Sequence, residues 1–162
     1  SIIEHFKGKN MDNLVVVSPD VGAIKMARAY SKGLGARLAT VDKRRVSGTE
    51  IEIGFVIGDV DGLNAILADD VIATGGSITA AAEIVLEKGA KSVSLACTHP
   101  LLCGPAVERL MGSPAQEFAF VDTIPVDGKI SDDRVSMLSC APAFANAIRK
   151  IHKSALIGRS SL

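Results

Sequence analysis

Short apolar segments recur along the chain, and most of them are uninterrupted by polar residues. Nearly continuous runs of this length are typical of strands that are covered on both faces in a parallel sheet, whereas a strand with one face in water alternates. The runs occupy residues 14–18, 36–41, 64–70, 92–98, 118–123 and 135–140. We expect each of them to form a strand.

Helical patterns lie between several of these runs. Their apolar stripes comprise Ala23, Met26, Ala27, Tyr30 and Leu34 in one segment and Ile78, Ala81, Ala82, Val85 and Leu86 in another. Gly35 and Gly89 follow the two stripes, in the position where a left-handed residue ends a helix. A third helix is expected from "GPAVERLM", with Pro105 in its first turn, and a fourth after Pro142. The apolar face of the fourth comprises Phe144, Ala147, Ile148 and Ile151.

Strands that alternate with helices predict an α/β fold, in which a doubly wound and mostly parallel sheet is flanked by helices. Residues 44–62 break this rhythm, because Ile51, Ile53 and Phe55 alternate with polar residues and glycine. We interpret this segment as a β-hairpin flap that projects from the sheet. A chain of 162 residues, 48% of them hydrophobic, is expected to fold as a single domain over residues 1–162.

Charge and composition exclude several classes of function. The 18 Lys and Arg residues balance 18 Asp and Glu residues, so no net field favours nucleic acid or an anionic membrane as a partner. No apolar run reaches the roughly 20 residues of a membrane span, and the first residues lack the apolar stretch of a secretory signal. We therefore expect a soluble, cytoplasmic protein. The three cysteines and three histidines share no metal-ligand spacing, which predicts reduced structural thiols and no zinc site.

The segment "LADDVIATGGSIT", residues 67–79, carries the strongest candidate site. A strand runs into Asp69 and Asp70, and residues 74–77, Thr-Gly-Gly-Ser, then lead into a helix. Glycines allow tightly turned backbone, so that successive N–H groups can converge on an anion at the positive end of the helix dipole. The hydroxyls of Thr74 and Ser77 would donate to the same anion. We interpret this loop as a cradle for a monophosphate.

The two carboxylates need another partner, because they would repel a phosphate. Sugar hydroxyls or a metal-bound group would satisfy Asp69 and Asp70, and hydroxyls beside a phosphate indicate a ribose 5-phosphate moiety. The alternative is an ordinary loop in which Ser77 caps the helix and the acids are solvated. Neither a GxxxxGK[ST] pattern nor a complete GxGxxG pattern occurs, which argues against a Walker loop and a dinucleotide fingerprint.

Two further segments follow expected strands. In "VVVSPDVGAIKMA", residues 15–27, Asp20 could hold Mg²⁺ between phosphate oxygens, or it could only cap the next helix. Lys43, Arg44 and Arg45 lie at the base of the expected flap, where cations would stabilise charge on a transferring phosphoryl group or would form only a solvated face. The pairs Thr98–His99 and Asp122–Thr123 follow two more strands and would border the cleft without a catalytic role.

Six ordered segments resemble landmarks of the C-terminal half of ribose-phosphate pyrophosphokinases, the PRPP synthases: "SPDVGA", "DKRR", "LADDVIATGGSIT", "CTHPLLCGPAVERL", "VDTIP" and "APAFANAIRKIH". The element "DDxxxTGGS" alone is similar to the PRPP-binding motif of type I phosphoribosyltransferases, and "DKRR" with "SPDVGA" narrows the likeness to the synthases. The resemblance implies a type I phosphoribosyltransferase fold and transfer of a pyrophosphoryl group from ATP to the anomeric hydroxyl of ribose 5-phosphate. AMP and PRPP would be the products, with Mg²⁺ as the cofactor.

The resemblance also implies roles for individual residues. The loop that holds the 5-phosphate would comprise Ala73, Thr74, Gly75, Gly76 and Ser77, and the ribose hydroxyls would face Asp69 and Asp70. The loop that meets the pyrophosphate would comprise Asp20, Val21, Gly22 and Ala23, with Asp20 as a Mg²⁺ ligand. The catalytic cations that stabilise the transition state would be Lys43 and Arg45.

The chain departs from the family pattern in composition and in length. Many members carry an acid in place of Ala73 and Thr in place of Ser77. Family members also contain two similar domains, of which the N-terminal one supplies most of the contacts to adenine, and neighbouring subunits complete the site. We therefore expect an excised domain of a homo-oligomeric enzyme, inactive without its missing N-terminal domain.

Two alternatives stay open. The first is a phosphoribosyltransferase that consumes PRPP and a nucleobase, which such enzymes stack on aromatic side chains. One Tyr, five Phe and no Trp offer little for this purpose. The second is a non-catalytic, synthase-like regulatory subunit, which would have no need of the cations Lys43 and Arg45.

Overall fold

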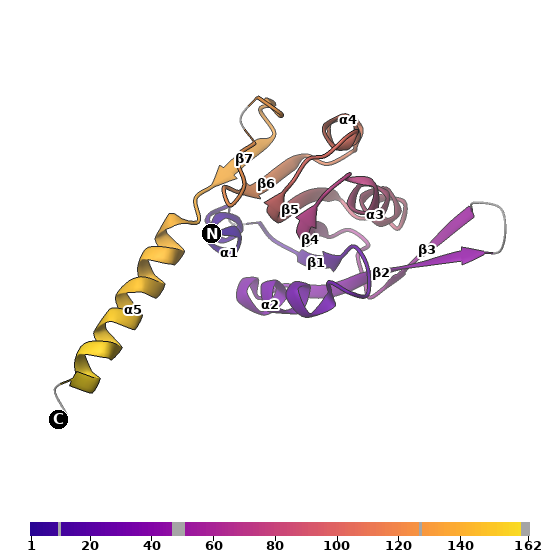
Figure 1. The fold of residues 1–162 in the computed structure, drawn as a ribbon. Coiled ribbons are helices and arrows are strands. Elements are labelled where there is room, and N and C mark those ends of the chain that lie inside the picture. The colour runs from indigo at the N-terminus through magenta and orange to yellow at the C-terminus, as the bar shows by residue number, and fades with distance from the viewer. Residues whose placement is uncertain (10, 47–50, 127, 160–162) are drawn as a thin grey trace.

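The computed structural model describes residues 1–9, 11–46, 51–126 and 128–159, which form a seven-stranded sheet with helices on both faces (Figure 1). The strands are β1 (Leu14–Ser18), β2 (Arg37–Val46), β3 (Ile51–Ile57), β4 (Asn64–Ile72), β5 (Ser92–Pro100), β6 (Glu117–Val121) and β7 (Val135–Leu138). The helices are α1 (Ile2–Gly8), α2 (Ile24–Leu34), α3 (Gly76–Glu87), α4 (Ala106–Gly112) and α5 (Ala141–Arg159). Every strand expected from an apolar run is present; β1 has the expected ends, and the other five differ at one or both ends.

The strand order is β3-β2-β1-β4-β5-β6-β7, and each neighbouring pair is parallel except β2 with β3. The chain passes from β1 to β2 on one side and returns to β4 on the other, so the direction of winding reverses beside β1. The doubly wound, mostly parallel sheet expected from the sequence is confirmed. Ligands of such sheets bind beyond the carboxyl ends of the strands that flank the reversal, which here are β1 and β4.

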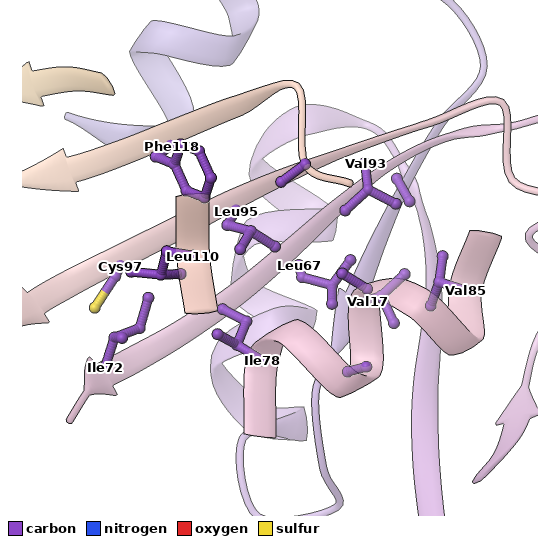
Figure 2. Packing of buried hydrophobic residues seen from close by; sticks show 14 of the residues in the cluster. Val17, Leu67, Ile72, Ile78, Val85, Val93, Leu95, Cys97, Leu110 and Phe118 are labelled. Carbon is purple, nitrogen blue, oxygen red and sulfur yellow. The ribbon is translucent and has the colours of Figure 1, made fainter. Parts of the chain in front are cut away.

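Alternate residues of the central strands face opposite layers of the core. Val15 and Val17 of β1 belong to one cluster with Ile78 of α3 and Leu110 of α4, whereas Val16 belongs to the other. Figure 2 shows the first cluster, in which side chains from β1, β4 and β5 meet those of α3 and α4. Burial on both faces explains why these strands read as unbroken apolar runs.

Helix α1 is an element that the sequence analysis did not predict. Its seven residues are too few for a recognisable periodic stripe, yet Ile2 and Phe6 are buried against the second face of the sheet. Glu117 of β6 also holds it, since its Oε1 lies 2.6 Å from both His5 Nε2 and Lys9 Nζ. Burial acts to raise the pKa of Glu117, but the hydrogen bonds from Lys9 and His5 lower it overall.

Glycine ends two helices as expected. Helix α2 stops at Gly35, which has a left-handed φ of 65°, and Gly89 follows α3 with a φ of 93°. The first residues of two other helices differ slightly from the expectation. Pro105 is the N-cap residue of α4 rather than part of its first turn, and α5 begins at Ala141, which places Pro142 inside the helix.

The antiparallel pair β2–β3 confirms the flap expected from residues 44–62. The first arm of the flap is the second half of β2. This strand continues to Val46, five residues beyond the apolar run, which ended at residue 41. Figure 1 shows the pair extending beyond the rest of the sheet. The connection between the arms, residues 47–50, lies outside the described residues.

Helix α5 extends away from the sheet (Figure 1). The apolar face expected for it exists but is not packed within the described chain, since Phe144, Ile148 and Ile151 are 62%, 65% and 71% exposed. None of the described helices combines the length and the apolarity needed to cross a membrane.

Candidate functional site

The candidate site lies beyond the carboxyl ends of β1 and β4, which are neighbours in the sheet. Residues 73–77, which we call the glycine loop, comprise the connection from β4 to α3 and the first two residues of α3. They line a pocket of about 160 Å³ together with Asp69. Asp20 follows β1, the parallel neighbour of β4, so the two connections lie at the same edge of the sheet, and the negative charge of Asp20 acts to raise the pKa of Asp69. The structure therefore brings together two segments that are about fifty residues apart in the sequence.

Glycine is required at the turn into α3. Gly75 is the N-cap residue of this helix and has a left-handed φ of 76°. Glycine adopts this left-handed conformation at little cost, whereas a residue with a Cβ would be strained there. An added Cβ would meet the carbonyl oxygen of Ala106 in α4 at 3.4 Å, so space alone would not exclude a side chain. The alternative in which Ser77 caps the helix is wrong, because Ser77 lies inside the first turn.

The glycine loop offers unpaired amides to the pocket. Within the described chain, the amides of Thr74 and Gly75 donate no hydrogen bond to another residue. The amides in the first turn of α3 also have no partner inside the helix, and the helix dipole makes this end positive. An anion of phosphate size would satisfy these donors.

Three successive carbonyls, of residues 72–74 at the end of β4 and the start of the glycine loop, accept hydrogen bonds from residues outside the loop. Leu102 and Cys103 donate from their amides to the carbonyls of residues 72–73, at 3.2 and 2.8 Å. Arg109 of α4 donates from Nη1 to the carbonyl of Thr74 at 3.1 Å. No role for Arg109 is predictable from the sequence, because a cation on a helix has the same local pattern whether it is solvated or reaches a distant loop.

Asp69 and Asp70 occupy different environments. Asp69 is half-buried and lines the pocket, whereas Asp70 is exposed. The pKa of Asp69 is raised to about 6, mainly by burial and also by the charges of Asp70 and Asp20, although a 2.9 Å hydrogen bond from the Asp70 amide to Oδ1 acts to lower it. A carboxyl that titrates close to neutrality and lines a pocket is typical of a functional site.

Hydrogen bonds from β1, from β2 and from its own loop fix Asp20. Its carbonyl accepts from the hydroxyls of Ser18 at 2.6 Å and Thr40 at 3.4 Å. Its Oδ1 accepts from the amide of Ala23 at 3.0 Å, so the side chain caps the turn that precedes α2. Oδ2 makes no hydrogen bond within the described residues. Capping by one oxygen therefore leaves the other available to a ligand.

Lys43 reaches the glycine loop from the flap. Its Nζ donates to the carbonyl of Ser77 at 2.7 Å and lies 3.3 Å from the Ser77 hydroxyl. The cross-strand partner of Lys43 is Gly54, where an added Cβ would overlap the side chain of Ile84 in α3. Because position 54 has no side chain, the hairpin lies directly against α3. The expected catalytic lysine and the expected phosphate loop are thus in contact.

The other two cations of the flap are Arg44 and Arg45. They lie on β2, in register with Ile53 and Glu52 of β3. Their side chains lie outside the described part of the structure. The catalytic role of Arg45 therefore stays a prediction.

The residues expected to border the cleft make local hydrogen bonds. His99 Nδ1 lies 2.9 Å from the hydroxyl of Thr123, which donates to the carbonyl of Thr98. Asp122 Oδ1 accepts from the amide of Cys140 at 2.7 Å and so holds the chain between β7 and α5. These contacts join strand ends to each other.

Metal-binding clusters are absent from the part of the chain that the structure describes: it contains no group of three or more His, Cys, Asp or Glu that could hold an ion. Cys97 is a fully buried core thiol, as expected, and burial raises its pKa to about 12. Thiolate chemistry at this position is therefore suppressed near neutral pH.

Comparison with known proteins gives the family. A family model described as the phosphoribosyl synthetase-associated domain matches residues 50–159. The ribose-phosphate pyrophosphokinase of Clostridium acetobutylicum is 48% identical over 147 residues, which are 91% of this chain and 46% of that protein. The chain spans about half the length of the curated relatives it matches.

Solved structures agree with this match. The phosphoribosylpyrophosphate synthetase of Mycobacterium smegmatis has a TM-score of 0.79 at 37% identity, over 94% of this chain and 48% of that one. The purine phosphoribosyltransferase of Pyrococcus horikoshii shares the fold, with a TM-score of 0.51 at 19% identity over 84% of this chain and 76% of its own. The expected type I phosphoribosyltransferase fold is confirmed. From these matches and the site geometry, the chain belongs to the phosphoribosyl synthetase-associated domain family.

Proposed function

We propose that this chain is the ribose 5-phosphate-binding and catalytic-loop domain of an enzyme that transfers a pyrophosphoryl group from ATP to ribose 5-phosphate. The observation that carries the proposal is the convergence of unpaired loop amides and the Asp69 carboxylate at one pocket, with the Lys43 amine bound to Ser77 of its lining. The names of its relatives, which are ribose-phosphate pyrophosphokinases, support it.

The pocket suits the two ends of ribose 5-phosphate. The amides of residues 74–77 and the hydroxyls of Thr74 and Ser77 donate to the 5-phosphate. Asp69 and Asp70 accept hydrogen bonds from the ribose hydroxyls, which keeps carboxylates away from the phosphate. At Ala73 the loop carries a methyl group, which adds no negative charge beside the anion.

The transfer itself forms a bond between the anomeric oxygen and the β-phosphorus of ATP. The bond from that phosphorus to the α–β bridging oxygen breaks, its electron pair leaves with AMP, and the hydroxyl proton is released. Negative charge develops on the transferring group, and Lys43, on a projecting flap, offsets it. When substrates bind, the Lys43 amine releases the carbonyl of Ser77 and donates hydrogen bonds to phosphate oxygens instead. Arg45 supplies a second cation.

Mg²⁺ fits the acids at this edge of the sheet. Proteins commonly hold this ion with one or two carboxylates, completed by substrate phosphates and water, rather than with a full cage. Asp20 supplies such a carboxylate through Oδ2, because Oδ1 already accepts from Ala23. The amides of Val21 and Gly22 then meet the pyrophosphate. When bound, the ion offsets the negative charge of the ATP phosphates.

Adenine recognition comes largely from outside this chain. We assign the sugar and its phosphate to the described pocket, and the chain spans about half of its relatives' length. We propose that a second, N-terminal domain and neighbouring copies in a homo-oligomer complete the ATP site. Turnover by this chain alone should accordingly be low, because half of the positioning contacts are missing.

Isothermal titration calorimetry with ribose 5-phosphate tests the proposed binding site. Wild type should bind saturably. Gly76→Val should bind about tenfold more weakly or worse, because its side chain obstructs the amides proposed to hold the phosphate. Asp70→Asn should lose a similar factor, because it removes a charged acceptor for a ribose hydroxyl. An added Cβ at Gly76 would lie 3.3 Å from Arg109 Nη1. The matched control is Asp12→Asn, an exposed acid before the amino end of β1. Equal affinities of all four proteins, or no binding by wild type at millimolar ligand, would contradict the proposal.

A transferase that consumes PRPP would use a similar pocket, and the products separate the two reactions. Phosphorus NMR of the chain with ATP and ribose 5-phosphate should show traces of AMP and PRPP that disappear in Lys43→Ala. Nucleotide formed from PRPP and a nucleobase would instead identify a phosphoribosyltransferase.

A further inference from the structure

We propose that Arg109 is a positioning residue that turns the glycine loop so that its amides face the phosphate. The inference rests on the proposed function of the pocket as the 5-phosphate site. It adds a residue from α4, an element to which neither the sequence pattern nor the proposed reaction assigns a role.

The geometry follows from the planarity of the peptide. A trans peptide points its carbonyl oxygen and the next residue's N–H in opposite directions. Arg109 Nη1 holds the carbonyl of Thr74 on the α4 side at 3.1 Å. The amide of Gly75 is therefore aimed away from α4, and it has no partner within the described chain. Fixing one oxygen thus presents one donor to an incoming anion.

Arg109 completes a series of such contacts. The two preceding carbonyls, of residues 72–73, accept from the main-chain amides of Leu102 and Cys103. By the same geometry, the amides of residues 73–74 point away from that segment. Main-chain donors need no particular side chain, whereas the third contact depends on the guanidinium. A single substitution at Arg109 can therefore release the last peptide of the series.

Arg109 acts from behind the loop. It is not among the residues that line the pocket, which are supplied by β4, the glycine loop and the start of α3. Its guanidinium lies against Gly76, where an added Cβ would be 3.3 Å from Nη1. A planar, permanently charged group at this distance also adds positive potential behind the loop. Positioning and charge are separable effects, and the two make different predictions for a lysine variant.

The test compares Arg109→Met, Arg109→Lys and a matched control, Arg28→Met, which alters an exposed arginine on α2. Calorimetry with ribose 5-phosphate should show about a tenfold loss of affinity for Arg109→Met, and partial recovery for Arg109→Lys, whose amine restores charge and a single donor. Amide NMR spectra without ligand should show displaced signals for residues 74–76 in Arg109→Met, with signals of the remaining core unchanged. The control should match wild type in both measurements.

Each outcome decides the inference. Wild-type affinity and unmoved loop signals in Arg109→Met would overturn it and leave the proposed function intact. Full recovery of affinity in Arg109→Lys while the loop signals stay displaced would also overturn it, because charge alone would then explain the effect. If wild type fails to bind, the proposed function fails, and the ligand-free spectra still decide: displaced signals support positioning by Arg109, and unmoved ones refute it.

Discussion

A carboxyl group that titrates near neutrality carries a cost in stability, and Asp69 is such a group. Burial, reinforced by the charges of Asp70 and Asp20, raises its pKa from 3.8 to about 6. Between these pH values the folded chain binds more protons than the unfolded chain. Stability therefore falls as the pH rises from about 4 to about 6, and the loss persists at higher pH. Ribose hydroxyls that donate to this carboxylate would offset the cost.

Asp69→Asn should accordingly stabilise the ligand-free chain at neutral pH. We expect a gain of about 1 kcal/mol in the free energy of unfolding at pH 7, after allowing for solvent screening of a half-exposed group. The gain should vanish near pH 4, where the wild-type carboxyl is protonated in the folded state. Urea unfolding of the variant and of wild type at pH 7 and pH 4 measures the gain and its loss, with Asp12→Asn as the control. A variant that is no more stable than wild type at pH 7 would show that burial of Asp69 is not costly.

At the scale of elements, the flap packs against α3, and this contact positions Lys43. Lys43 and Gly54 face each other across β2 and β3, and the missing side chain at position 54 lets the hairpin rest on Ile84. This contact places the lysine amine over Ser77 at the start of α3. The position of Lys43, the cation proposed to be catalytic, thus depends on a glycine in the opposite strand.

Gly54→Ala should lift the flap from α3 and cost about 1 kcal/mol or more in the free energy of unfolding, because its methyl group overlaps Ile84. The amide NMR signal of Ser77 should shift as the lysine withdraws. A double-mutant cycle with Ile84→Ala should recover part of the cost. Gly112→Ala, at the end of α4 where an added Cβ meets nothing within 4 Å, is the matched control. Additive effects of the two substitutions would contradict this account of the flap.

Elements with a clear periodicity could be predicted from the sequence. Strands β1 and β4 have unbroken apolar runs, and helices α2 and α3 have apolar stripes, because the side chains at these positions pack in the core. The type of each residue therefore reports its burial directly. Helix α1 could not be predicted, because Phe6 and Ile2 form a helix face only once the sheet covers them. The extension of β2 to Val46 depends on pairing with β3, which is a contact between segments and not a property of either one.

At the scale of the whole molecule, the winding of the sheet assembles the site. The glycine loop and Asp20 were recognisable from residue types after expected strands, and the reversal beside β1 brings them to one edge. Arg109 was not recognisable, since its contact with Thr74 exists only after α4 packs on the turn into α3. The exposed apolar face of α5 likewise shows that packing within the described chain does not account for the whole sequence pattern.

The most direct test of the central claim is an amide NMR titration of the chain with ribose 5-phosphate. The account predicts saturable shifts that are concentrated in residues 69–77 and at Lys43, with tighter binding of ribose 5-phosphate than of inorganic phosphate or ribose alone, because both ends of the ligand are recognised. Shifts that are scattered over the surface, or equal affinities for inorganic phosphate and ribose 5-phosphate, would contradict it.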